Sequence, residues 1–174
     1  MSIKCIDNFL EPQVFKHIQD VFLSDHFSWF FNEHKVYGDK EYFDNFQLTH
    51  ILYKEGDPKS NKLAELSKEL WQNLGVDLLL TCKANLTTRV EKPTITGYHN
   101  DVTVPGATTA VLYINSNNGA TIFENGKEYQ SVANRCVMFP SSIKHASKSH
   151  TDTKRRVVLN INYLNEKTMV ENIK

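Results

Sequence analysis

Two residues in the segment GYHNDV, His99 and Asp101, are of types that bind metal ions, and they stand two positions apart. In an extended strand, residues i and i+2 point to the same face, so this imidazole and this carboxylate could reach one cation together. A third ligand is available in His145, which follows the apolar segment RCVMF. Two histidines and one carboxylate are typical of a non-haem Fe(II) centre, and they leave three coordination positions for other molecules.

The same His-x-Asp spacing occurs a second time, at His150 and Asp152. This copy lies in the polar run ASKSHTDTK, which lacks strand alternation and indicates a loop. No histidine follows it to complete a ligand set. The context therefore favours His99 and Asp101, together with His145, as the metal ligands.

An anion-binding residue is expected on the segment RRVVLNINY. In a strand, Arg156 shares one face with Val158, Asn160 and Asn162, and this face is the more polar of the two. An arginine fork on a strand suits a carboxylate. Arg155 is the competing candidate, because a bulge would shift the alternation by one residue. Asn85, Thr87 and Arg89 alternate along another expected strand and are candidates for polar groups that face the same pocket.

Two helices are expected to support these residues. Apolar residues recur at helical spacing over 12–24, and Pro12 suits a first turn. The second helix is predicted to begin with Asp57 as its cap and Pro58 in its first position. It continues through a leucine-rich stripe and stops at Gly75.

The rest of the chain reads as short strands. The expected strands are 2–10, 47–53, 77–90, 94–102, 108–115, 120–125, 127–132, 135–140 and 155–164. Asn125-Gly126 predicts a tight hairpin between two of them. Helices followed by many short strands indicate a mainly β protein, a jelly roll (double-stranded β-helix) backed by N-terminal helices, in one domain over 1–174. The mouth of such a fold is a natural place for a metal or small-molecule site.

Composition restricts the class of protein. The 174 residues are 40% hydrophobic and 23% charged, and their formal net charge is zero, which argues against nucleic acid as a partner. No apolar run is long enough for a membrane span, and the first residues lack the pattern of a secretion signal. Three cysteines with no CxxC pair indicate reduced, buried thiols. We therefore expect a cytoplasmic protein.

Taken in order, these motifs resemble the 2-oxoglutarate- and Fe(II)-dependent oxygenases, in particular the prolyl-4-hydroxylase-like branch and its small phage-type members. The matching segments are YHND, AVLYIN, NGATIFENG, NRCVMFPSSIKH and RRVVLNINY, which together cover about 78–164, and IDNFLEPQVFKHI resembles the family's N-terminal strand and helix. The resemblance implies that His99, Asp101 and His145 bind iron. It also implies that Arg156 pairs with the far carboxylate of 2-oxoglutarate and that Tyr113 hydrogen-bonds it.

The implied reaction is the hydroxylation of a peptide side chain, such as proline, or of a small molecule, with release of succinate and CO2. Fe(II) and 2-oxoglutarate would be the cofactors, and ascorbate would keep the iron reduced. Asp101 favours hydroxylation over halogenation, because halogenases of this fold have a small residue in place of the carboxylate. The alternatives are another cupin-type metalloenzyme and a non-catalytic jelly-roll binding module. The aromatic segment 27–53 is interpreted as packing, with a substrate lid as the other reading.

Overall fold

The computed structural model describes residues 2–36 and 46–165, which form two antiparallel sheets and two α-helices. In the large sheet the strand order is β1-β9-β6-β11-β5-β3-β2, with β4 paired to β3; the small sheet has the order β10-β7-β8. The large-sheet strands are β1 (Lys4–Ile6), β2 (Phe30–Asn32), β3 (Gln47–Lys54), β4 (Asp57–Pro58), β5 (Leu78–Thr88), β6 (Thr108–Tyr113), β9 (Cys136–Pro140) and β11 (Arg155–Leu164). The small-sheet strands are β7 (Ala120–Phe123), β8 (Glu128–Gln130) and β10 (His145–Lys148).

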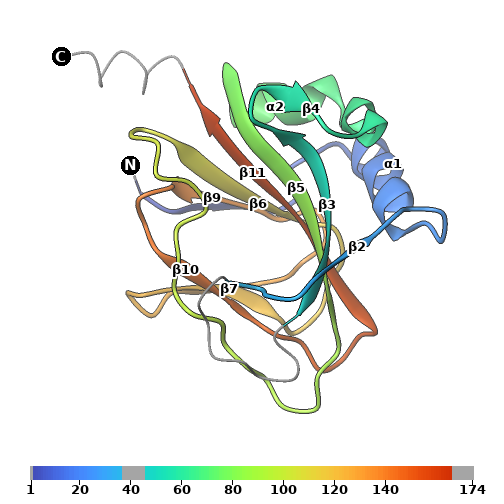
Figure 1. The fold of residues 1–174 in the computed structure, drawn as a ribbon, viewed down its shortest axis with the longest axis vertical. Helices are drawn as coiled ribbons and strands as arrows, with labels where there is room; N and C mark the ends of the chain where they lie inside the picture. The colour runs from blue at the N-terminus through green and yellow to red at the C-terminus, as the bar shows by residue number, and fades with distance from the viewer. Residues whose placement is uncertain (1, 37–45, 166–174) are drawn as a thin grey trace.

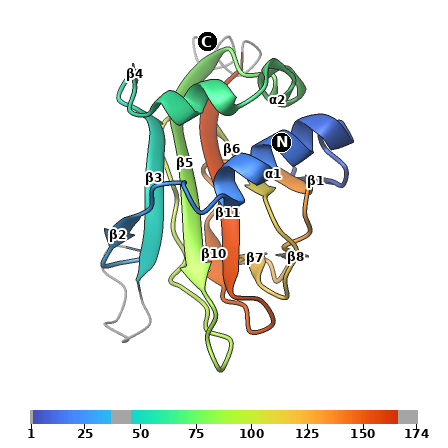
Figure 2. The ribbon, with the colours of Figure 1, turned by 90° about the vertical axis from the view of Figure 1, so that its right-hand side faces the viewer.

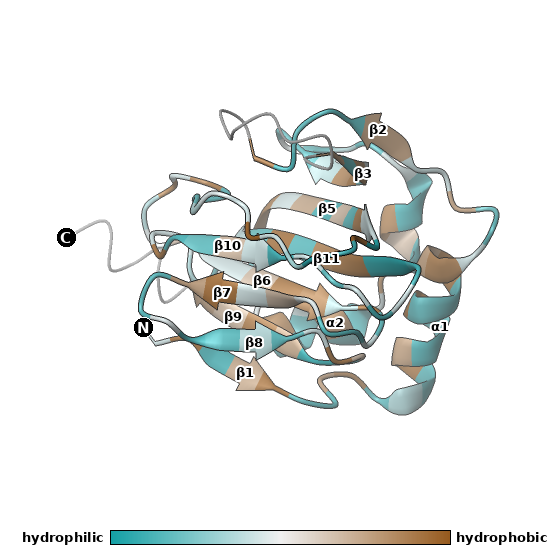
Figure 3. Ribbon diagram, turned by 90° about the horizontal axis from the view of Figure 1, so that it is seen from below, coloured by the Kyte–Doolittle hydropathy of each residue, from teal (hydrophilic) through white to brown (hydrophobic). Residues whose placement is uncertain are grey.

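The large sheet is covered on both faces. Helices α1 (Pro12–Leu23) and α2 (Lys68–Leu74) lie on the side away from β7 and β10 (Figure 1), and in the turned view they stand in front of the sheet (Figure 2). Ile18, Phe22 and Leu70 pack there against the strands, in the larger apolar core. A smaller core, which includes Tyr113 and Phe139, lies between the two sheets. The hydropathy view agrees, since β6 and β7 are largely brown whereas β8 is mostly teal (Figure 3).

Strand β11 divides these two cores. Val157, Leu159 and Ile161 belong to the larger core, and Val158 belongs to the smaller one. The strand pairs with β5 on one side and β6 on the other, so a one-residue slip would exchange every side chain between the helices and the pocket. The alternation predicted for this segment is confirmed, and the register shifts only between Asn162 and Tyr163.

The first predicted helix is confirmed, whereas the start predicted for the second is wrong. Asp57 and Pro58 form the short strand β4, and the 3-10 helix η1 (Asn61–Glu65) follows. Leu66 is extended, and α2 begins only after Ser67, whose hydroxyl accepts a hydrogen bond from the Leu70 amide at 3.2 Å. Ser60 caps η1 by accepting a hydrogen bond from the Lys62 amide, and Ser67 caps α2, so the leucine-rich stripe forms two short helices. Gly75, with φ of 69°, ends α2 as predicted.

The predicted strand 94–102 is absent as a regular element. Its backbone meets β10 at two isolated bridges, Ile95 with Lys148 and His99 with His145. Between them the Ser147 amide donates to the hydroxyl of Thr96 at 2.9 Å, so a side chain replaces a backbone carbonyl and interrupts the ladder. Strands β2, β4 and β10 were not predicted from the sequence.

The Asn125-Gly126 hairpin joins β7 to β8 as predicted, although its loop has three residues, 124–126, because the Phe123 amide donates to the Lys127 carbonyl. All three cysteines are free; Cys82 and Cys136 are buried as expected, but Cys5 on the edge strand β1 is exposed. No helix within the described residues is long and apolar enough to cross a membrane.

The aromatic segment 27–53 combines buried and exposed rings. Phe27 packs against Phe22 and Trp29 with ring centroids 4.8 Å apart in both pairs. Phe30 and Phe31 are 60% and 67% exposed. Packing is therefore confirmed for the start of the segment, while residues 37–45 lie outside the described residues.

Because α2 begins after Ser67 and not at Asp57, substitutions of these two residues should differ in their effect on stability. Ser67→Ala should lower the free energy of unfolding by about 1 kcal/mol, because the Leu70 amide loses its acceptor. Asp57→Ala should cost less than about 0.5 kcal/mol, since it removes only an exposed ion pair with Lys59. Urea denaturation of both variants measures the difference. An equal or larger loss at Asp57 would contradict the helix boundary.

Candidate functional site

The three predicted metal ligands lie together between the two sheets. His145 is the first residue of β10, and His99 pairs with it through backbone hydrogen bonds of 3.0 Å and 3.1 Å in the two directions. Asp101 follows two positions after His99. The extended chain at this single bridge thus places His99 and Asp101 beside His145, although no regular strand is present.

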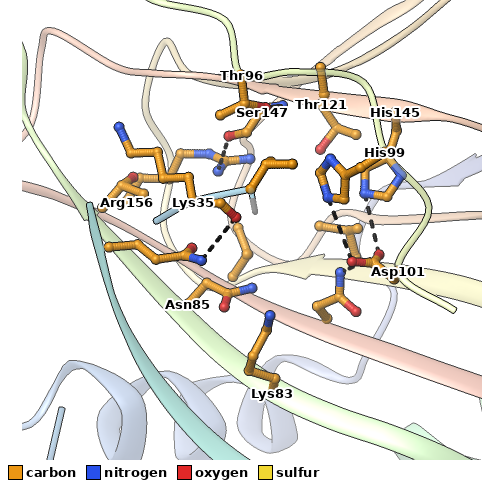
Figure 4. A pocket seen from close by; sticks show the side chains of 17 residues that line it. Lys35, Lys83, Asn85, Thr96, His99, Asp101, Thr121, His145, Ser147 and Arg156 are labelled. Carbon is orange, nitrogen blue, oxygen red and sulfur yellow. Dashed lines mark hydrogen bonds and ion pairs between the residues drawn. The ribbon is translucent and has the colours of Figure 1, made fainter. Parts of the chain in front are cut away.

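The ligand atoms of the three side chains all lie within 4.8 Å of one another. Nε2 of His145 is 3.3 Å from one carboxylate oxygen of Asp101, and Nε2 of His99 is 3.7 Å from the other (Figure 4). All three side chains are largely withdrawn from solvent, with exposed fractions of 27% for His99, 14% for Asp101 and 8% for His145. A metal held by bonds of about 2 Å would require only a small closure of this triangle.

The imidazole of His99 is oriented by its own loop. Nδ1 of His99 donates to the Gly97 carbonyl at 3.1 Å, which leaves the Nε2 lone pair directed at the triangle. Burial and the neighbouring His145 lower the pKa of His99, against the opposing effect of Asp101, and this favours the neutral imidazole that a metal requires. Nδ1 of His145 is buried without a hydrogen-bond partner among the described residues.

The carboxylate of Asp101 is held by a chain of buried amides. Asn160 donates from Nδ2 to Oδ2 of Asp101 at 2.8 Å, and Asn162 donates to Oδ1 of Asn160 at 2.8 Å. Thr109 in turn donates to Oδ1 of Asn162, which fixes the amide orientations along the chain. Burial raises the pKa of Asp101, but the hydrogen bond and charge of His145, the hydrogen bond from Asn160 and the charge of His99 together outweigh it and leave the pKa below its usual range.

Arg156 lies at the other end of the same pocket (Figure 4). It is 5% exposed, and its guanidinium donates to the hydroxyls of Ser131 at 2.7 Å and Ser147 at 3.2 Å. Among the described residues it forms no ion pair with a carboxylate, so a buried positive charge faces the pocket with neutral partners only. Gly119 permits this placement, because a Cβ there would come within 2.9 Å of the Arg156 Cδ.

Arg155 points away from the pocket. Its guanidinium donates to the carbonyl of Leu23, at the end of α1, at 2.7 Å. The second His-x-Asp copy does not join the triad either. The carboxylate of Asp152 accepts hydrogen bonds from the Asn118 backbone amide at 3.0 Å and 3.2 Å, and so joins its loop to the loop that contains Asn118.

Tyr113 is fully buried behind the pocket wall and is not part of its lining. Its hydroxyl lies 2.8 Å from Oγ1 of Thr121, which does line the pocket, and 3.1 Å from the carbonyl oxygen of Tyr129. The ring centroid is 5.6 Å from the guanidinium carbon of Arg156. Tyr113 thus supports Arg156 and Thr121 from behind.

Strand β5 contributes polar residues on the pocket side. Asn85 and Thr87 line it as predicted, and Oδ1 of Asn85 and Oγ1 of Thr87 have no hydrogen-bond partner among the described residues. Arg89 follows the end of β5 and is exposed, so it does not face the pocket. Lys83 also lines the pocket, and sequence analysis missed it. The signal that could have found it is the alternation of Asn85 and Thr87, which continues back to Lys83.

The similarity of this chain to known proteins concerns its fold. No family model and no curated protein matches the sequence. Among solved structures, an oxidoreductase of the 2OG-Fe(II) oxygenase family from Burkholderia pseudomallei aligns with a TM-score of 0.62 and 8% identity, over 92% of this chain and 84% of its own.

Two prolyl hydroxylases have a similar structure. The prolyl-4-hydroxylase of Pseudomonas putida aligns with a TM-score of 0.57 and 15% identity, over 94% of this chain and 92% of its own. The Trichoplax adhaerens prolyl hydroxylase was solved with a peptide of hypoxia inducible factor. It aligns with a TM-score of 0.60 and 13% identity, over 97% of this chain and 86% of its own. At such identities the likeness concerns the fold. The chain has the double-stranded β-helix fold shared by these oxygenases, as its sequence predicted.

Proposed function

We propose that the protein is an Fe(II)- and 2-oxoglutarate-dependent oxygenase that hydroxylates a peptide side chain or a small molecule. The observation that carries this proposal is the position of a buried arginine without a carboxylate partner at one end of a pocket and a His-Asp-His triangle at the other. The fold of the similar oxygenases supports it.

The side chains present fit an iron site. Two imidazoles and one carboxylate form the facial ligand set of non-haem Fe(II), which keeps three positions open. His99 already presents Nε2, and Asp101 is held as an anion by Asn160. His99, Asp101 and His145 would hold the metal. Another cupin-type metalloenzyme is less well supported, because such sites generally rest on more than two histidines.

The pocket also fits 2-oxoglutarate. Its far carboxylate would pair with Arg156, a buried fork whose two serine partners keep it in place. A direct hydrogen bond from Tyr113 to the cosubstrate, as the family resemblance implies, would require its hydroxyl to exchange one of its present partners. Val111 and Val158 line the pocket between the two ends and would exclude water.

When bound, iron and 2-oxoglutarate supply the oxidising chemistry: O2, 2-oxoglutarate and a C–H bond give succinate, CO2 and an alcohol, with one oxygen atom in succinate and one in the alcohol. The residues of the chain bind, orient and shield the reactants. Iron in this site would need to stay reduced, and ascorbate would serve that purpose. The structure of a prolyl hydroxylase with a bound peptide supports a peptide substrate, and a small molecule is the other class.

A visible charge-transfer band tests the proposal. Fe(II) and 2-oxoglutarate added to the protein without oxygen should produce the band of the chelate, and His99→Ala should abolish it, because one of three ligands is lost. His17→Ala is the matched control, since His17 is an exposed histidine paired with Glu65. Failure of the unmodified protein to produce the band would contradict the proposed function.

The two neighbouring arginines should behave differently. Arg156→Met should weaken 2-oxoglutarate binding by about 100-fold, as expected when a buried ionic contact loses one partner. Binding of Mn(II) alone should change little, because Arg156 contacts none of the three ligands. Arg155→Met is the control, since its guanidinium contacts Leu23 outside the pocket. Anaerobic calorimetry measures both affinities, and a larger effect at Arg155 would overturn the assignment.

The amide that holds Asp101 should affect the metal itself. Asn160→Ala should reduce Co(II) or Mn(II) affinity by about tenfold, because the carboxylate loses the donor that orients it. Asn118→Ala, which removes a surface amide paired with Thr151, serves as the control. Metal titration followed by fluorescence or absorbance measures the change. Equal affinities in the two variants would show that Asn160 does not position the ligand.

A further inference from the structure

A second hollow adjoins the pocket between Arg156 and the triad. Strands β3, β5 and β11 form its walls, and it shares Lys83, Asp101 and Asn160 with the first pocket. Ile51 and Tyr53 give it an apolar side. Because Asp101 is one of the proposed iron ligands, this hollow reaches the metal position from a different direction than Arg156 does.

The strand register places Arg156 and Lys83 at separate ends of the pocket. On β5, Thr87 is paired with Arg156 and Lys83 is paired with Asn160. These two rows are four positions apart, a distance of about 13 Å along an extended strand. Figure 4 shows Lys83 on the side of the pocket opposite Thr96 and Ser147, apart from the guanidinium. A cosubstrate anchored at Arg156 and chelated at the triad therefore leaves the Lys83 ammonium available.

The charge of Lys83 is not compensated by the chain. Lys83 is half-buried, and it forms no ion pair or hydrogen bond with any residue in the described ranges 2–36 and 46–165. Lys54, the other lysine of the hollow, is paired with Glu55 at 3.2 Å. Asp101 is the one acidic residue among the described residues of the lining, and its oxygens face His99, His145 and Asn160.

We infer that this hollow is the substrate subsite of the proposed oxygenase and that Lys83 binds a carboxylate of the substrate. The inference rests on the proposed function and adds the substrate class to it. A partly buried ammonium with no partner is costly, and an anionic ligand offsets that cost. The carboxylate would lie beside Asn160, and the carbon to be hydroxylated would lie between it and the metal. The carboxylate belongs either to the side chain of a free acidic amino acid or to the side chain of an acidic residue in a peptide.

Paired probes test the inference. The anaerobic Fe(II) and 2-oxoglutarate complex is titrated with free aspartate and glutamate against asparagine and glutamine. A second series uses capped pentapeptides that carry Asp or Glu against Asn or Gln at the centre. The readouts are a shift of the charge-transfer band, and then succinate release in oxygen. In at least one series an acid should bind at least tenfold more tightly than its amide, and the series in which this occurs identifies the source of the carboxylate.

Three variants assign the preference to one residue. Lys83→Met should remove the preference for acids and leave the band of the Fe(II) and 2-oxoglutarate complex unchanged. Lys83→Arg should keep the preference, and so should Lys59→Met, a matched charge change at a lysine outside both hollows.

A preference that survives in Lys83→Met overturns the inference. So does equal binding of acids and amides, or the absence of a shift with every probe. Absence of the band in the unmodified protein would instead refute the proposed function, so the two failures are distinguishable.

Discussion

One backbone pairing determines the geometry of the candidate site. The hydrogen bonds between His99 and His145 join an irregular segment to the first residue of β10, and they bring two imidazoles to ring centroids 4.6 Å apart. Asp101 depends on the same bridge, because its direction follows from the extended chain between it and His99. The bridge thus does what a regular strand would do for three ligands, and its loss would separate them.

Strand β11 provides the second constraint. Its two faces serve different purposes, since one packs against the helices and the other presents Arg156 and Asn160 to the pocket. Both polar side chains are buried among partners that hold them: two serine hydroxyls for Arg156, and the Asn162 amide for Asn160. Because β11 lies between β5 and β6, its register is strongly specified, and the spacing between the anion-binding end and the metal end is fixed with it.

The sequence was most informative where a local pattern and the burial of the chain agree. The alternation of 155–164 predicted the inward position of Arg156, and the helical spacing after Pro12 predicted α1. Predictions failed where long-range contacts decide the outcome. The segment 94–102 meets β10 at two isolated backbone bridges, between which a hydroxyl acceptor interrupts the ladder, and Ser67 caps the helix that was predicted to begin at Asp57. The alternation along β5 includes Lys83, but its position near the proposed metal ligands follows from its pairing with Asn160, which is a long-range contact.

The most direct measurement is anomalous diffraction from crystals grown without oxygen in Mn(II) and 2-oxoglutarate. The proposed function predicts one manganese peak bonded to Nε2 of His99, a carboxylate oxygen of Asp101 and Nε2 of His145. It also predicts that 2-oxoglutarate extends from the metal to the guanidinium of Arg156. A manganese ion bound elsewhere, or a cosubstrate that does not reach Arg156, would contradict it.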